Sequence, residues 1–137
     1  MANHHDAELI LKLYDLRREE VCRKARAWFG AWTPLTADEV RAVVSGERRE
    51  ENAYMRQATS YWEMAFSIAN NGAVDAPLFA KNCGEGYWFV AKCQGLKAKF
   101  PDAWQRTMAE GEAFIAGNLL AQSRFEMFQK RVGAQLK

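Results

Sequence analysis

Four polar residues inside aromatic stretches are the candidates for a binding site. Tyr61 and Glu63 lie in one such stretch, and Glu85 and Tyr87 lie in another, beside two glycines. An unpaired buried carboxylate is too costly to keep ionised, so a buried Glu63 would need an arginine or tyrosine partner. Two interpretations stay open. In the first, the four side chains line a small pocket. In the second, which we favour, Glu63 is solvated or pairs with an arginine that fixes helix packing.

Metal chemistry has no matching set of residues. The only histidines, His4 and His5, are adjacent and close to the start of the chain. A di-iron helical bundle needs Glu-x-x-His pairs on two helices, and the sequence has none. The separation of Cys83 and Cys93 is not a zinc-ligand spacing. We therefore predict no metal and no cofactor.

Nucleophilic catalysis is equally unsupported. The chain has three cysteines, Cys22, Cys83 and Cys93, and no histidine in the folded part to activate them. Their odd number and wide separation favour buried thiols in a reducing compartment over a disulfide. Gly84 to Gly86 is too short for a phosphate-binding loop and lies inside a helical pattern. We predict no catalytic residue and no enzymatic activity.

The composition limits which other classes of protein the chain can belong to. The 137 residues, 49% hydrophobic and 26% charged, predict a single domain over residues 1–137 that buries its own core. The net charge of +2 is small and the bases are interspersed with acids, so we expect no nucleic-acid partner. Neither a signal peptide nor a membrane span is apparent, which favours a cytoplasmic protein. Residues 1–5 are expected to be disordered.

The two aromatic stretches fall on predicted helices. A central helix over about residues 50–71 carries two adjacent apolar rows, wider than a surface helix needs. Trp62 lies in the middle of this helix and should be buried against the first and fourth helices. Asn71-Gly72 ends the helix, and Asp75 caps a fourth helix that continues to about Lys99.

The first helix is predicted to be long, from Asp6 to about Trp32. A heptad row of apolar residues runs along it, broken only at Arg18: Leu11, Tyr14, Val21, Ala25, Trp28 and Trp32. Thr36 and Glu39 form a capping box for a short second helix that ends at Ser45-Gly46. For the charged run 47–51, a loop is slightly favoured over the start of the central helix.

The last third predicts two more helices. Gly84 and Gly86 weaken the fourth helix, through close approach to another helix, a kink, or backbone offered to a ligand, and we favour close approach. Trp104 and Met108 are placed on a short helix after Pro101, and a final helix follows it. The fold class is thus all-α, a compact bundle of five or six helices.

The chain also resembles a known family. The stretches DAELILKLYDLRREEVCRKARAWF, SGERREENAYMR and SYWEMAFSIANNGAVDAPLF are similar to small bacterial helical proteins of a domain-of-unknown-function family. The resemblance covers about residues 6–99. It implies a compact helical domain and supplies no catalytic residue.

Two functions follow as hypotheses. The leading one is a non-catalytic module that works by association with a protein partner, most simply as a homodimer. Five tryptophans and eight phenylalanines exceed the needs of a small core, and Trp28 and Trp32 are the predicted interface residues. The alternative is a bundle that binds an unidentified small molecule in a pocket near Glu63 and Glu85.

Overall fold

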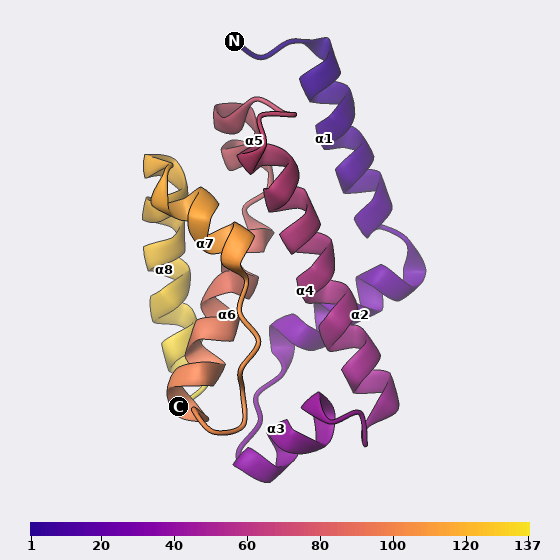
Figure 1. Ribbon diagram of the computed structural model, residues 1–137, viewed down its shortest axis with the longest axis vertical. Helices are drawn as coiled ribbons and strands as arrows, with labels where there is room; N and C mark the ends of the chain where they lie inside the picture. Colours follow the sequence, from indigo (N-terminus) through magenta and orange to yellow (C-terminus); the bar gives the residue numbers. More distant parts are fainter.

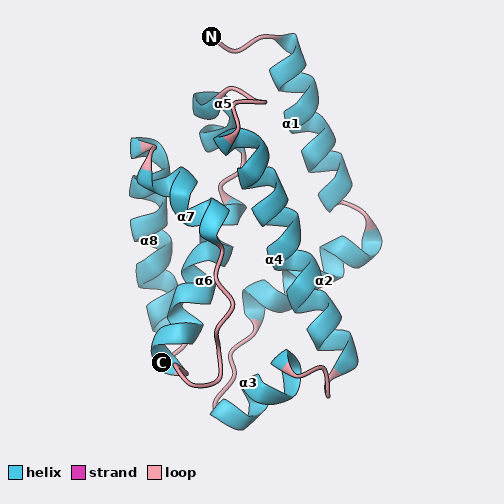
Figure 2. Ribbon diagram, in the orientation of Figure 1, coloured by secondary structure: helices cyan, strands magenta, loops and turns pink.

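The chain folds into eight α-helices and no strand, in a computed structural model that describes residues 1–137 (Figures 1 and 2). The all-α prediction is therefore confirmed, whereas the predicted number of five or six helices is too low. The helices are α1 (His4–Arg17), α2 (Glu20–Ala31), α3 (Ala37–Val44), α4 (Arg49–Asn70), α5 (Ala76–Asn82), α6 (Glu85–Lys99), α7 (Ala109–Ala116) and α8 (Leu119–Gln135).

Helix α4 is the centre of the arrangement. It contacts α2, α3, α5, α6 and α7, while α8 packs mainly on α6 (Figure 1). Its inward side is filled with apolar side chains, among which Trp62 and Phe66 are fully buried. The prediction that Trp62 is buried is confirmed. Gly72 takes a φ of +76° just after α4, as expected of a glycine that ends a helix.

Two predicted helices, the first and the fourth, are each divided in two, and a further break at Gly117 and Asn118 separates α7 from α8. The first divides at Arg18 and Glu19, where the Glu19 carboxylate accepts the amides of Val21 and Cys22 and so caps α2. The other divides at Cys83 and Gly84, between α5 and α6. Glutamate is not a preferred N-cap residue, so the cap at Glu19 gave little signal in the sequence.

The break at Glu19 changes which side of α1 faces the core. Ile10 and Leu13 are buried, while Leu11 and Tyr14 from the predicted heptad row are exposed. The heptad prediction is therefore wrong for this part of the chain, because the two helices no longer share one register. An apolar row of α1 is left on the outside of the molecule.

Smaller corrections concern the helix ends. Helix α1 starts at His4 with Asn3 as its N-cap, so His4 and His5 are helical, and Asp6 is the third helical residue. Helix α4 starts at Arg49, which places part of the run 47–51 in the helix. Thr36 caps α3 as predicted, and the Glu39 carboxylate accepts the amide of Leu35 instead of that of Thr36.

The segment after α6 is a loop where a short helix was predicted. Trp104 and Met108 are fully buried, but they belong to the extended connection to α7. This connection runs along the bundle beside α6 (Figure 1). The Trp104 ring lies 6.0 Å from that of Phe29 in α2, centroid to centroid. The amide of Trp104 donates to the Phe100 carbonyl at 2.9 Å in a single turn, and burial of the two large side chains fixes the rest of the loop.

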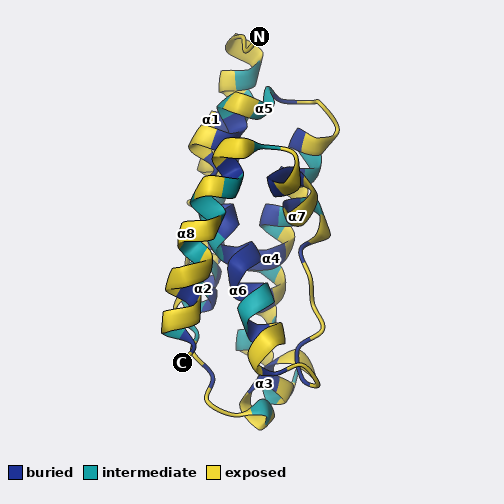
Figure 3. Cartoon of the chain, turned by 90° about the vertical axis from the view of Figure 1, so that its left-hand side faces the viewer, coloured by how far each residue is buried: buried dark blue, intermediate teal, exposed yellow.

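Buried residues line the inward sides of the helices, and exposed ones lie outside (Figure 3). Aromatic rings from α5, α6 and α7 surround Phe66 of α4. The distances between ring centroids are 5.7 Å to Phe79, 6.0 Å to Tyr87 and 5.7 Å to Phe114. Aromatic clusters of this size dominate the burial energy of a small domain.

Candidate functional site

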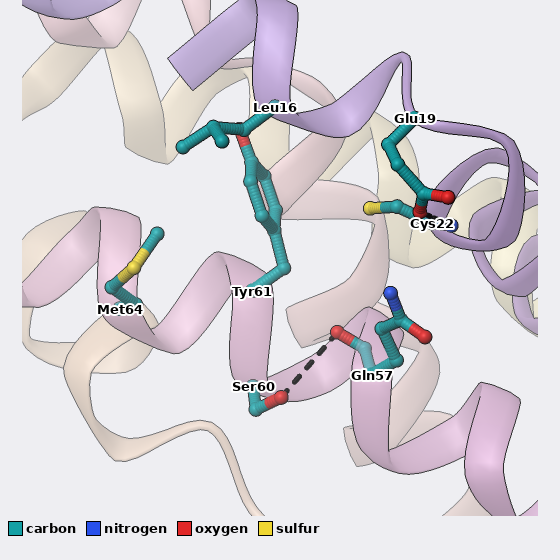
Figure 4. Close-up of a pocket in the computed structure, with 7 residues that line it drawn as sticks. All are labelled: Leu16, Glu19, Cys22, Gln57, Ser60, Tyr61 and Met64. Atoms are coloured by element: carbon teal, nitrogen blue, oxygen red, sulfur yellow. Dashed lines mark hydrogen bonds between the residues drawn. The ribbon is translucent and has the colours of Figure 1, made fainter. Parts of the chain in front are cut away.

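A groove between α4 and the break at Arg18 and Glu19 is the first candidate site (Figure 4). We call this break between α1 and α2 the hinge. Its volume is about 390 Å³, within the range of small-ligand sites. Side chains from both sides of the hinge face one side of α4 across it. The groove is lined by Leu16, Glu19, Cys22, Gln57, Ser60, Tyr61 and Met64.

The polar groups of this groove are largely engaged in the fold. The Tyr61 hydroxyl donates to the carbonyl of Leu13, and burial raises the pKa of Tyr61 to about 12, so it stays a donor. The amides of Val21 and Cys22 lower the pKa of the Glu19 carboxyl that they bind. The Ser60 hydroxyl donates to the Arg56 carbonyl at 2.6 Å. The groove therefore presents a mainly apolar surface.

The cysteines are buried and free. Burial raises the pKa of the Cys22 thiol, and it raises those of Cys83 and Cys93 to about 11 and about 12. A thiol is nucleophilic as its thiolate, so all three are protonated and weakly reactive near neutral pH.

Glu85 binds an arginine that the sequence analysis did not single out. The Arg26 Nη1 atom lies 2.9 and 2.6 Å from the two Glu85 oxygens, and Trp62 Nε1 donates to Glu85 Oε1 at 3.1 Å. Arg26 Nη2 also donates to the Arg17 carbonyl at 2.9 Å, at the end of α1. Arg26 thus joins α1, α2 and α6. Its position one turn after Cys22 and one before Phe29, on the buried side of α2, was an available signal.

Glu63 binds backbone amides and has no arginine partner. Its two oxygens accept from Glu110 N at 3.0 Å and Gly111 N at 2.9 Å, in the first turn of α7. The Asn70 side chain adds a hydrogen bond to the Glu110 carbonyl at 2.8 Å. A carboxylate stabilises the positive end of a helix, so Glu63 fixes α7 to α4.

The four predicted pocket residues hold different parts of the fold. Tyr87 is fully buried, and its hydroxyl donates to the Ala80 carbonyl at 3.0 Å. Tyr61 binds α1, Glu63 binds α7, and Glu85 binds α2. Of the four, Tyr61 lines the hinge groove. A pocket shared by all four stays a prediction.

The two predicted interface tryptophans are half-buried. Trp28 and Trp32 stack on each other at 4.9 Å between ring centroids. Trp28 lies 6.3 Å from the Tyr54 ring, and Trp32 lies 6.1 Å from the Trp104 ring. Much of their surface is thus covered within the chain, and their role in an interface stays a prediction.

Lys92 is a buried charge without a carboxylate partner. Its ammonium donates to the Gly30 carbonyl at 3.2 Å and to Gln135 Oε1 at 2.7 Å. Trp88 Nε1 and Gln135 Nε2 bind the same carbonyl, at 3.3 and 2.9 Å. Gly30 lies in the last turn of α2, where a cation is favourable. Burial nevertheless lowers the pKa of Lys92 from 10.5 to about 8.

This lysine gives a pH dependence of stability that can be measured. Its folded pKa is below the unfolded one, so between about 8 and 10.5 the unfolded chain binds more protons and stability rises with pH. We expect wild type to gain up to about 3 kcal/mol relative to Lys92→Met across this window. The raised pKa values of Cys83, Cys93 and Tyr61 act in the opposite direction, but they are present in both proteins. Urea unfolding at several pH values measures the difference, and a difference that does not vary with pH would show that Lys92 is solvated.

Residues 2–101 match the model of one protein family, Domain of unknown function (DUF4760). The chain belongs to this family. The DUF4760 match spans α1 to α6, including the hinge groove and the Arg26–Glu85–Trp62 contacts. The α7 amides that bind Glu63, and Gln135 beside Lys92, lie outside the DUF4760 match. Searches of curated proteins and of solved structures found no match.

The DUF4760 match names no activity for the domain. Side chains of His, Cys, Asp and Glu form no group of three or more that could hold a metal ion. None of the helices is both long enough and apolar enough to span a membrane.

Proposed function

We propose that this chain is a non-catalytic helical domain that associates with a second copy of itself through the outer surface of α1 and its neighbours. The observation that carries the proposal is the exposed apolar row of α1. Leu11 is 68% exposed and Tyr14 is 51% exposed, although both lie in the middle of a helix. Exposed apolar surface that gathers in one region is typical of an interface.

Neighbouring side chains extend this surface. Leu16 at the end of α1 and Met64 on α4 are exposed and line the same groove, and Val21 at the start of α2 is exposed beyond the hinge. An interface built on one 14-residue helix and its flanks is smaller than that of a stable obligate dimer. We therefore expect weak, concentration-dependent association.

A small-molecule site in the hinge groove is the second candidate. The groove has a suitable volume of about 390 Å³ and an apolar lining. Ligand sites also offer a few convergent polar groups, and here Glu19, Ser60 and Tyr61 bind the protein backbone. Self-association accounts for Leu11 and Tyr14 as well, which lie outside the groove, so we favour it.

Replacement of Leu11 by glutamate should weaken self-association. A buried unpaired carboxylate in the interface is unfavourable, and we expect the dissociation constant to rise at least about tenfold, or about 1.4 kcal/mol. Sedimentation velocity across a concentration series measures this change.

Leu119→Glu is the matched control, because Leu119 is 83% exposed on α8 and does not belong to this surface. Both substitutions should change the free energy of unfolding by less than about 0.5 kcal/mol. If Leu11→Glu and Leu119→Glu sediment alike, the α1 surface is not the interface.

A further inference from the structure

The charges around the exposed row of α1 form a self-complementary pattern. Four charged residues flank Leu11 and Tyr14 on the outer side of the helix, and all four are exposed: Glu8, Lys12, Asp15 and Arg18. Their spacing along the helix places these four residues on the side that faces away from the buried residues Ile10 and Leu13. In Figure 1, α1 lies at the edge of the molecule, with no helix on its outer side.

Reversal of the helix direction matches each charge with its opposite. If a second α1 is laid antiparallel on the outer side, with the twofold axis at the level of residue 13 along the helix, Glu8 lies opposite the partner's Arg18 and Lys12 lies opposite the partner's Asp15. Leu11 then lies opposite the partner's Tyr14. These three pairs share nearly the same midpoint, so one register satisfies them all. A twofold interface also repeats each pair, because the same surface is used on both chains.

The parallel arrangement lacks this match. It would place like charges side by side, Arg18 next to the partner's Arg18 and Glu8 next to the partner's Glu8, which is unfavourable. Within the chain, Lys12, Asp15 and Arg18 make no ion pair, and Glu8 has only a long contact of 4.0 Å with the His5 ring. The charges are therefore available to a partner.

We infer that α1 pairs antiparallel with α1 of a second copy of this chain, with Leu11 and Tyr14 at the centre and the Glu8–Arg18 and Lys12–Asp15 charge pairs around them. This inference rests on the proposed function and specifies its partner and geometry. The apolar centre supplies the attraction, and the charge pattern selects the antiparallel register.

Two charge-reversal variants test the pairing. Glu8→Lys with Asp15→Lys makes all four flanking positions basic, and Lys12→Glu with Arg18→Glu makes all four acidic, while Arg17, which lies 4.1 Å from the Tyr14 ring, is unchanged in both. Each variant alone should raise its dissociation constant at least about tenfold over that of the wild type, because every pair becomes repulsive. An equimolar mixture should form a heterodimer as tightly as the wild-type dimer or more tightly. Sedimentation velocity measures association, and native mass spectrometry separates heterodimers from homodimers by mass.

Two controls accompany the mixture. Glu126→Lys with Lys130→Glu exchanges two exposed charges on α8 and should leave self-association unchanged. High salt should weaken the heterodimer, since exposed charge pairs are screened. Circular dichroism checks that each variant folds. Should a double variant be unfolded, the single changes Glu8→Lys and Arg18→Glu carry the same mixing test.

The possible outcomes separate the two proposals. A wild-type protein that stays monomeric at high micromolar concentration overturns the proposed function and this inference with it. A wild-type dimer whose charge-reversal variants self-associate as before, and mix without preference, overturns the antiparallel pairing and leaves self-association standing. Selective formation of the heterodimer supports both.

Discussion

Trp62→Ala is expected to lower the free energy of unfolding by about 3–5 kcal/mol, the range of large-to-small aromatic changes in protein cores. Trp62 is fully buried, and its ring lies 5.2 Å from that of Tyr61 and 6.2 Å from that of Phe66. The change would also remove the Nε1 donor to Glu85. Domains of this size have a total stability of only about 5–15 kcal/mol, so the variant should be close to unfolding at physiological temperature.

Urea unfolding curves measure this effect, with Trp28→Ala as the control. Trp28 is half-buried, so its truncation should cost less stability. Trp62→Phe isolates the indole N–H, because it keeps most of the apolar volume while Arg26 still binds Glu85. A Trp62→Ala protein with the urea midpoint of the wild type would mean that α4 is not the centre of the core.

Gly86→Ala is expected to destabilise the protein by about 1–3 kcal/mol through overpacking. A Cβ atom at Gly86 would lie 2.6 Å from Phe66 Cζ and 2.9 Å from Trp62 Cε3, well inside the normal contact distance. Both rings are fully buried and have little room to shift. Close approach is thus the explanation for this glycine, as we favoured from the sequence.

Gly133→Ala should have the opposite effect and is the matched control. Gly133 also lies inside a helix, and nothing lies within 4 Å of the position of its added Cβ. We expect a gain of about 0.5–1 kcal/mol, because alanine loses less backbone entropy in a helix. Thermal or urea unfolding of the two variants checks the sign, and equal effects would contradict the close contact at Gly86.

Local patterns in the sequence predicted the helices that have strong caps and wide apolar rows. Helix α4 is found within about one residue of its predicted range, and Thr36 and Asp75 cap α3 and α5 as expected. These features depend on neighbouring residues only, so they can be read without knowledge of the tertiary structure.

The breaks in the first and fourth predicted helices depend on contacts between distant residues. Arg26 satisfies the carbonyl of Arg17 at the end of α1, and Arg124 Nη1 satisfies that of Lys81 near the end of α5, at 3.0 Å. Helix ends leave carbonyls without partners, and such side chains from other helices satisfy them, at the end of α1 without a glycine or proline and at the end of α5 beside Gly84. No local sequence pattern predicts them.

In the candidate site too, local features could be predicted from the sequence and contacts between distant residues could not. The sequence singles out Tyr61 and Tyr87 as polar residues within aromatic stretches, but it does not indicate which groups their hydroxyls bind. The sequence suggests an arginine as a partner for Glu63, whereas its partners are two amides of α7, which follows almost fifty residues later in the chain. The sequence also did not reveal that the apolar row of α1 is exposed, because a heptad pattern does not tell which side of a helix faces the core.

Sedimentation equilibrium of the wild-type protein tests self-association most directly. The account predicts that the weight-average mass rises with concentration, from the monomer mass of 15.6 kDa towards twice that value in the micromolar range. A mass that stays at 15.6 kDa up to high micromolar concentration would contradict it.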